Sequence, residues 1–176
     1  MKQLIDEDTI RARVAALAQE IADTYGQTPI TIVGIMTGSL LFLADLVRHL
    51  SMPLRVGVLQ ATSYRGNVDP GELHIYADGL LDIQGREVLL VDDIFDTGRT
   101  LVETMRHLEK FQPASIRSAV LLLKKGKQQV DYRPDFTGFE IPDVFVVGYG
   151  LDYRDLYRNL PYVAALEPGE LAEKDA

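Results

Sequence analysis

The spacing of apolar residues changes repeatedly along the chain and predicts helices that alternate with strands. Between residues 8 and 25 apolar side chains recur every three or four positions, and the pattern stops at Gly26, so this segment is predicted to form an amphipathic helix. The run ITIVGIM at 30–36 is short, β-branched and almost entirely apolar, which is typical of a strand that is covered on both faces. Helical spacing returns in SLLFLADLVRHL at 39–50. Together these segments predict half of a βαβ unit.

The rest of the chain continues this alternation. Residues 65–72, RGNVDPGE, are rich in turn-forming residues and predict an exposed loop of the kind that acts as a lid. A polar connection, rich in Lys, Gln, Asp and Pro, is predicted between 125 and 143. Strands alternating with helices indicate an α/β fold: a mainly parallel, twisted sheet flanked by helices and joined by right-handed crossovers. The further strands are predicted at 54–64, 72–80, 87–91, 116–125 and 143–150, and a further helix at 100–111.

Length and composition narrow the class of protein. A chain of 176 residues is the size of one domain, and 47% hydrophobic with 25% charged residues is usual for a soluble globular protein. The net charge of -8 and a pI near 4.8 disfavour a nucleic-acid partner, because such proteins usually carry a basic surface. With no cysteine, the chain has neither a disulfide nor a thiolate zinc site.

The apolar stretches of the chain do not predict export or membrane insertion. The first residues, MKQLIDEDTIRARV, include acids where a signal peptide needs an apolar core. The most apolar stretch, SLLFLADLV, is interrupted by Asp45 and is far shorter than the roughly 20 residues of a membrane-spanning helix. We therefore expect a cytoplasmic protein without a membrane partner.

Polar clusters follow four of the predicted strands. MTGS at 36–39 follows the first, DDIFDTGRT at 92–100 follows EVLLV, Lys124 and Lys125 close the next, and GYGLDY ends the last. In an open α/β sheet, ligands bind beyond the carboxyl ends of the strands. The four clusters are therefore expected to share one crevice.

The segment VLLVDDIFDTGRTL ends in a turn that can hold an anion. The first backbone N–H groups of a helix have no partner inside the helix and carry partial positive charge. Here the helix is predicted to begin after Thr97 and Gly98, with hydroxyl donors on Thr97 and Thr100 and with Arg99 nearby. DTGRT is therefore interpreted as a cradle for one phosphate. The alternative is an ordinary helix start capped by Asp96 or Thr97.

Three carboxylates, those of Asp92, Asp93 and Asp96, precede or adjoin this cradle. Carboxylates about 6 Å apart repel each other by on the order of 3 kcal/mol at an effective dielectric constant of about 20, so such a cluster needs compensation. A divalent cation provides it, and neighbouring carboxylates also accept hydrogen bonds from a vicinal diol such as the ribose 2'- and 3'-hydroxyls. A sugar phosphate satisfies both halves of the segment, with its diol and a metal ion over Asp92 and Asp93 and its phosphate on the amides of 97–100.

Two segments carry a resemblance to a known family. VLLVDDIFDTGRTL resembles the phosphoribosyl-diphosphate (PRPP) signature of the purine phosphoribosyltransferases, and RPDFTGFEIPDVFVVGYGLDYRDLYRNLPYVAAL is similar to the hypoxanthine-guanine branch. The likeness spans about residues 5–166. It implies a type I phosphoribosyltransferase fold in a single domain, with a core at about 28–142 and a small hood formed from about 1–27 and 143–176.

The resemblance also implies a reaction. A nitrogen of a 6-oxopurine displaces pyrophosphate from the anomeric carbon of PRPP, with Mg2+ as the cofactor, and the products are IMP or GMP in purine salvage. The expected partners are these small molecules and further copies of the chain in a homodimer or homotetramer.

Residues that match the motifs of the family take their roles from it. Asp92 and Asp93 engage the ribose hydroxyls and the metal, and Asp96 acts as the general base near the purine N7, beside the phosphate cradle at 97–100. Lys124 donates to the purine 6-oxo group, which favours hypoxanthine and guanine over adenine. The remaining matches are Phe145 and Val146 for the base, Asp152 for the base and a second metal site, Arg158 and the turn of Met36, Thr37, Gly38 and Ser39 for pyrophosphate, and Ser63 and Tyr64 at the start of a catalytic loop.

Two positions depart from the family pattern. The family commonly has lysine where this chain has Thr37, so weaker pyrophosphate binding is expected, through backbone amides. Val144 also stands where a lysine is frequent, which leaves the base preference open. A xanthine-preferring enzyme is therefore one alternative.

Other classes of protein also use paired aspartates. A receiver domain needs a Lys-Pro pair, which the chain lacks, and phosphatases of the Asp-x-Asp type need carboxylates two positions apart near the N-terminus. A regulator that keeps the phosphoribosyltransferase fold but senses nucleotides is a further alternative. Asp96 and Lys124 argue against it, because a sensor does not need catalytic groups.

Overall fold

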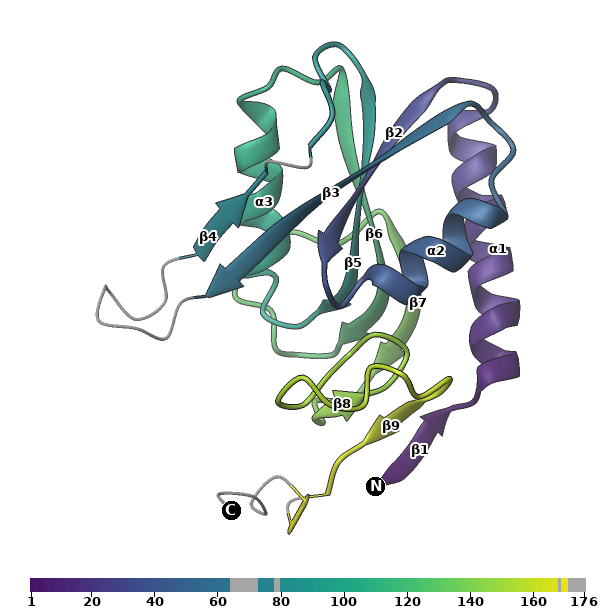
Figure 1. Cartoon of the computed structure of the whole chain (residues 1–176), viewed down its shortest axis with the longest axis vertical. Helices are drawn as coiled ribbons and strands as arrows, with labels where there is room; N and C mark the ends of the chain where they lie inside the picture. The colour runs from purple at the N-terminus through teal and green to yellow at the C-terminus, as the bar shows by residue number, and fades with distance from the viewer. Residues whose placement is uncertain (64–72, 78–79, 168, 171–176) are drawn as a thin grey trace.

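The computed structural model describes residues 1–63, 73–77, 80–167 and 169–170. Most of the described residues belong to a six-stranded sheet with helices on both of its faces (Figure 1). The order of the strands is β4-β3-β2-β5-β6-β7. All neighbouring pairs are parallel except β3 with β4, which is antiparallel. The strands are β2 (Ile30–Met36), β3 (Leu54–Ser63), β4 (Leu73–Tyr76), β5 (Glu87–Phe95), β6 (Ser115–Lys124) and β7 (Phe136–Ile141).

This arrangement confirms the predicted α/β fold with a mainly parallel sheet. The central strands have few polar side chains because both of their faces are covered, as expected for parallel strands. Strand β7 was missed, since its sequence FTGFEI lies in the segment predicted as a polar connection. It pairs in parallel with β6, and this pairing buries Phe136 and Ile141.

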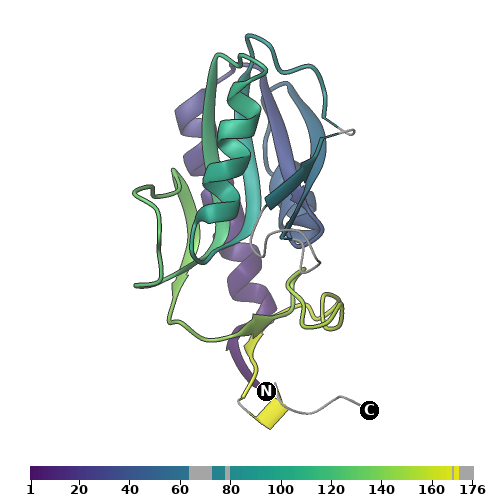
Figure 2. The same cartoon turned by 90° about the vertical axis from the view of Figure 1, so that its left-hand side faces the viewer.

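In the described part of the chain, three helices cover the sheet. Helices α1 (Glu7–Tyr25) and α2 (Leu40–Arg48) pack on one face, and α3 (Arg99–Glu109) packs on the other (Figure 2). Helix α1 begins where Asp6 accepts a hydrogen bond from the backbone N–H of Thr9, at 2.8 Å. The three helices confirm the predicted segments to within a few residues.

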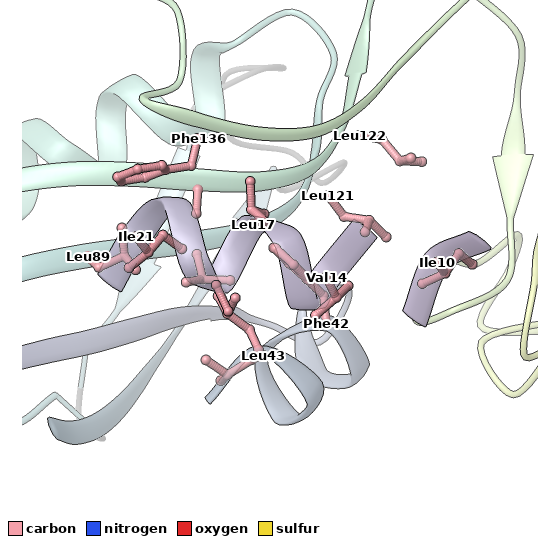
Figure 3. Packing of buried hydrophobic residues seen from close by; sticks show 14 of the residues in the cluster. Ile10, Val14, Leu17, Ile21, Phe42, Leu43, Leu89, Leu121, Leu122 and Phe136 are labelled. Carbon is pink, nitrogen blue, oxygen red and sulfur yellow. The ribbon is translucent and has the colours of Figure 1, made fainter. Parts of the chain in front are cut away.

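The larger apolar core lies between α1, α2 and the sheet. Figure 3 shows Val14, Leu17 and Ile21 of α1 directed toward side chains of the sheet, with Phe42 of α2 beside them. Leu17, Ile21 and Phe42 are fully buried. The helical spacing of the apolar residues thus matches the face of α1 that is packed. This larger core holds α2 in place, and α2 in turn holds the turn that connects it to β2.

A second, smaller sheet joins the two ends of the chain. Its order is β1-β9-β8, and both pairings are antiparallel. The strands are β1 (Lys2–Ile5), β8 (Val146–Val147) and β9 (Val163–Ala165), which lie beyond the carboxyl ends of the central strands (Figure 1). The strand predicted at 143–150 is therefore wrong in both length and position, because only two of its residues form a strand and they belong to this other sheet.

We propose that the chain is a single domain with the six-stranded sheet as its core and the small sheet with its loops as a hood. Helix α1 belongs with the core in this division. Its Arg13 donates hydrogen bonds to the backbone carbonyls of Thr137 and Gly138 in β7, at 2.7 and 2.8 Å. Within the described part of the chain, no helix has the length and apolarity needed to span a membrane.

Candidate active site

A cleft of about 410 Å³ opens where β2, β3 and β5 end and the hood begins. Side chains and backbone from four separate segments line it, and three of them belong to the polar clusters that the sequence predicted: MTGS, DDIFDTGRT and GYGLDY, but not Lys124 and Lys125. Its lining includes eleven of the predicted site residues: Met36, Thr37, Gly38, Asp92, Asp93, Asp96, Thr97, Gly98, Thr100, Asp152 and Arg158.

The paired carboxylates lie on β5 itself. The strand continues through Asp92 and Asp93 to Phe95, four residues past the predicted end, so the two aspartates belong to a strand and not to a turn. The backbone N–H of Asp93 donates to Oδ1 of Asp92 at 3.0 Å. Burial raises the pKa of both carboxyl groups, and the negative charge of Asp93 raises that of Asp92 further. Because the charged forms of these two carboxyl groups are unfavourable without a partner, the pair favours a ligand that brings positive charge or hydrogen-bond donors.

The start of α3 brings backbone N–H groups to the edge of the cleft. Gly98 precedes the helix in a left-handed conformation, with φ of 85°, and the N–H of Arg99 donates to Oγ1 of Thr97 at 3.4 Å. The first helical bond runs from the N–H of Val102 to the carbonyl of Gly98, at 3.1 Å. The amides before Val102 therefore have no partner within the helix, which is the property predicted for an anion cradle. The alternative of a helix capped by Thr97 keeps one contact in its favour, the bond from the N–H of Arg99, while no hydrogen bond from the first turn to the side chain of Asp96 is present among the described residues.

Gly98 is required at this turn for two reasons. Its positive φ suits glycine, and a Cβ atom at this position would lie 2.4 Å from Cγ2 of Val130 and 2.6 Å from Cζ of Phe95. The glycine thus lets the segment around Val130 pack directly against the turn. A hydrogen bond from the N–H of Gln129 to the carbonyl of Thr97, at 2.9 Å, fixes this contact.

The turn after β2 packs against the carboxylate pair. A Cβ atom on Gly38 would lie 1.8 Å from Oδ2 of Asp93, so the backbone of this turn touches the carboxylate directly. On its other side, a Cβ atom on Gly150 would lie 2.2 Å from the carbonyl oxygen of Gly38. Ser39 does not line the cleft, because it is buried and its hydroxyl donates to the carbonyl of Ile35 at 2.6 Å.

The hood contributes one cation and one carboxylate. Nη2 of Arg158 lies 2.8 Å from Oδ1 of Asp152, and Nη1 donates to the carbonyl of Gly150 at 2.7 Å. These two contacts hold the guanidinium at the wall of the cleft, where its charge partly opposes the raised pKa of Asp93. Arg158 and Asp152 therefore face the paired carboxylates from the hood side.

Lys124 and Asp96 form an ion pair at the end of the cleft. Nζ of Lys124 lies 3.2 Å from Oδ2 of Asp96, and Lys124 is buried although it carries a charge. Lys124 does not itself line the cleft, but Asp96 does. Two residues that the sequence analysis missed, Lys127 and Asp143, also contact this pair.

Four predicted residues lie away from the cleft. The guanidinium of Arg99 lies 3.6 Å from a carboxylate oxygen of Glu103 and lines a separate hollow, while its backbone N–H donates to Oγ1 of Thr97 at 3.4 Å. Phe145 is 41% exposed and meets Tyr153 edge to face, with ring centroids 5.5 Å apart. Val146 is buried in β8. Ser39, whose hydroxyl donates to the carbonyl of Ile35, also lies away from the cleft.

The prediction of a catalytic loop stays a prediction. Tyr64 lies outside the described residues, and Ser63 is the last residue of β3. The carboxyl end of β3 does contribute Gln60, Ala61 and Thr62 to the cleft, and the sequence analysis missed them. Their position at a strand end on the same edge of the sheet was the available signal.

Most of the chain matches a known protein family. A family model described as a phosphoribosyl transferase domain matches residues 1–154. The parallel sheet and the cleft at its carboxyl edge are therefore those of the phosphoribosyltransferase class.

The similar curated proteins narrow the family. The hypoxanthine-guanine phosphoribosyltransferase of Aquifex aeolicus is 44% identical over 169 residues, which is 95% of each chain. That of Bacillus subtilis is 39% identical over 95% of this chain and 93% of its own. The chain belongs to the hypoxanthine-guanine phosphoribosyltransferase family.

Solved structures agree with this assignment. Hypoxanthine phosphoribosyltransferase from Trypanosoma cruzi, solved in complex with the product IMP, has a TM-score of 0.88 at 36% identity, covering 96% of this chain and 95% of that one. A hypoxanthine-guanine phosphoribosyltransferase from Bacillus anthracis also has a TM-score of 0.88, at 33% identity, covering 95% of this chain and 98% of that one. The family fold thus extends over nearly the whole chain.

Proposed function

We propose that the protein transfers the phosphoribosyl group of PRPP to hypoxanthine or guanine and releases pyrophosphate. In this reaction a purine ring nitrogen bonds to the anomeric carbon while the bond from that carbon to pyrophosphate breaks. The observation that carries the proposal is the ion pair of Lys124 with Asp96, 3.2 Å apart, at the end of a cleft that also holds the buried Asp92, the half-buried Asp93 and the start of α3.

The Lys124–Asp96 pair complements one edge of a 6-oxopurine. That edge presents the 6-oxo acceptor next to the N7–H donor. The ammonium of Lys124 can donate to the oxygen while the carboxylate of Asp96 accepts from the nitrogen. Adenine presents an amino group in place of the oxygen, which would direct a donor at a donor. The pair therefore favours hypoxanthine and guanine.

The rest of the cleft fits PRPP. The amides at the start of α3 suit its 5'-phosphate, and Asp92 and Asp93 suit the ribose diol. The backbone of Met36–Gly38 and the guanidinium of Arg158 lie where the pyrophosphate would sit if the sugar occupies this position. With Thr37 in place of the usual lysine, we expect Arg158 to carry more of the contact with pyrophosphate.

Mg2+ fits the carboxylates as the cofactor of this reaction. Asp92 and Asp93 form no ion pair with any described residue, and burial raises the pKa of both. Among the described residues no three acidic or histidine side chains come together as a complete metal site. Mg2+ usually takes one or two carboxylates and completes its shell with substrate phosphates and water. Asp92 and Asp93 would hold one ion and Asp152 of the hood a second, and these ions would neutralise charge on the pyrophosphate.

Asp96 serves as the base in this proposal. It lines the cleft next to the phosphate cradle, where its carboxylate can accept the N7 proton as the ring nitrogen attacks. The negative charge also stabilises a sugar that becomes cationic at the anomeric carbon. Lys124 and Asp96 thus recognise the base and assist its reaction through one pair of contacts.

Steady-state turnover tests the proposal. Hypoxanthine, guanine, xanthine and adenine are each assayed with PRPP and Mg2+, and we expect turnover of the first two and none of adenine. Lys124→Ala should raise the KM for hypoxanthine and leave the KM for PRPP unchanged. Lys125→Ala is the matched control, because the exposed Lys125 pairs with Glu140 at 3.3 Å. A larger kcat/KM for xanthine would support the xanthine-preferring alternative, and binding of PRPP without turnover of any base would support the regulator.

Two further expectations belong to the proposal. We propose that the chain works in the cytoplasm as a homodimer or homotetramer. A solved hypoxanthine phosphoribosyl transferase from Trypanosoma cruzi is 35% identical to this chain, and its C-terminal region has a role in its oligomeric state and enzymatic activity. Light scattering of the purified protein would give the number of subunits directly.

A further inference from the structure

The ion pair of Lys124 and Asp96, proposed above to recognise the base, belongs to a closed ring of four charged side chains. Asp96 contacts Lys124 at 3.2 Å through Oδ2 and Lys127 at 3.4 Å through Oδ1. Asp143 contacts the same two ammonium groups, with its Oδ1 3.2 Å from Lys127 and 3.7 Å from Lys124. The ring alternates in sign and has no net charge.

Lys127 is held in place by its own loop. Gln128, the next residue, donates to the backbone carbonyl of Lys124 and, at 3.4 Å, to that of Asp96. The N–H of Gln129 donates to the carbonyl of Thr97 at 2.9 Å. The loop is therefore tied to the turn that carries Asp96, which keeps the backbone of Lys127 close to that aspartate.

The orientation of the second carboxylate oxygen of Asp96, Oδ1, depends on Lys127. Oδ1 of Asp96 is buried, and no described residue donates a hydrogen bond to it. The ammonium of Lys127, 3.4 Å away, is the cation that faces it. The last torsion of an aspartate side chain is broad, so one contact on Oδ2 leaves the carboxylate free to rotate. A second cation on Oδ1 fixes the plane of the carboxylate.

We propose that Lys127 and Asp143 are positioning residues that keep Asp96 and Lys124 aligned for the edge of the purine. The proposal rests on the function proposed above and extends it to residues that do not line the cleft. Asp143 holds Lys127 through its closer contact and draws the pKa of that lysine upward. Lys127 in turn holds Oδ1 of Asp96.

Removing Lys127 alone would unbalance the ring. Asp96 and Asp143 would then share the single ammonium of Lys124, and the group of three would carry one net negative charge. Lys124 would be drawn between two carboxylates and would be less available to the 6-oxo group. Removing the charge of Asp143 as well would restore a neutral Asp96–Lys124 pair.

Purine kinetics of four variants test the proposal. Lys127→Met should raise the KM for hypoxanthine about ten-fold, the order of magnitude expected when one charge-assisted hydrogen bond is lost, with the KM for PRPP unchanged. Lys127→Arg should keep wild-type values. The double variant Lys127→Met with Asp143→Asn should recover most of the loss, which a purely structural role would not produce because its effects would add. Lys125→Met removes the same charge one residue after Lys124 and should behave as wild type.

Two results separate the inference from the proposed function. If the wild type turns over hypoxanthine but Lys127→Met matches Lys125→Met, or if the double variant is worse than Lys127→Met, the positioning role is wrong and the function stands. If the wild type does not turn over hypoxanthine with PRPP and Mg2+, the function is wrong and the inference falls with it. Melting temperatures of all variants show whether any loss comes from unfolding.

Discussion

The carboxylate of Asp93 packs so close to Gly38 that the residue at position 38 has no room for a Cβ atom. This contact joins the end of β5 to the turn after β2, the two segments that supply the sugar side and the pyrophosphate side of the proposed PRPP site. The distance between the two halves of the site is therefore fixed by backbone packing and not by long side chains.

Gly38→Ala should separate these two halves. The new Cβ atom would lie 1.8 Å from Oδ2 of Asp93, so the carboxylate or the turn has to move. We expect the KM for PRPP to rise by about ten-fold or more, since overpacking of this kind costs about 1–3 kcal/mol.

The matched control for Gly38 is Gly85→Ala. Gly85 has a positive φ of 66° and open space around its Cβ position, so the change strains the backbone far from the cleft. It should lower the melting temperature and leave the KM for PRPP unchanged. Equal KM values for Gly38→Ala and the wild type would refute the role of the contact.

Asp96→Asn should reduce turnover more than binding. The amide keeps the shape of the side chain but cannot take up a proton, so kcat should fall by about 10²–10⁴-fold, the usual contribution of a general base. The KM for PRPP should change little, because the phosphate cradle is built from backbone. Asp131→Asn, an exposed aspartate, serves as the control. A kcat equal to that of the wild type would assign the base to another residue.

Asp92→Asn should stabilise the protein and weaken substrate binding. Burial raises the pKa of Asp92, which means that its charged form is unfavourable in the folded protein at neutral pH. The neutral amide should raise the melting temperature by about 2–4 °C without substrate, while the affinity for PRPP falls. Calorimetry with and without PRPP and Mg2+ measures both effects. A lower melting temperature than that of the exposed control Asp82→Asn would contradict this account of the buried charge.

Asp6→Ala should destabilise the protein in a pH-dependent way. Asp6 accepts hydrogen bonds from both the N–H and the hydroxyl of Thr9, and these lower its pKa below the ordinary value of 3.8. A carboxyl group whose folded pKa is lowered contributes stability above its unfolded pKa and loses it as the pH falls through the folded pKa. The difference in melting temperature from the wild type should therefore be present at pH 7 and shrink at pH 3. A constant difference across this range would show that the charge of Asp6 plays no part.

The sequence predicted the elements whose patterns are strong. Helical spacing located α1, and the apolar runs located β2, β5 and β6, because burial on both faces leaves a continuous apolar signal. Strand β5 was predicted to end before Asp92, since charges normally mark the end of a buried strand. The pairing with β6 continues past the aspartates to Phe95 and keeps them in the strand.

The parts of the fold that were missed depend on tertiary pairing. Strand β7 is an edge strand with a mixed sequence, and its state is fixed by hydrogen bonds to β6. The segment at 143–150 reads as apolar because the hood buries it, yet only Val146–Val147 pairs with another strand. Local patterns carry no information about which sheet a short strand joins.

The sequence predicted which acidic residues gather at the candidate site but not all of the contacts that hold them. Strand-end positions brought Asp92, Asp93 and Asp96 to one cleft as expected. Asp96 and Lys124 are also contacted by Lys127 and Asp143. These two residues come from a loop and a hood segment that are distant in sequence, so no local pattern predicted the contacts. No local pattern indicated that the hydroxyl of Ser39 donates to the carbonyl of Ile35 in β2.

A crystal structure with bound IMP tests the central claim most directly, because the product carries both the base and the 5'-phosphate. The account predicts the phosphate on the amides at the start of α3, the ribose hydroxyls beside Asp92 and Asp93, and the purine oxygen within hydrogen-bonding distance of Nζ of Lys124. A phosphate bound elsewhere, with the first turn of α3 facing only solvent and the purine away from Lys124, would contradict it.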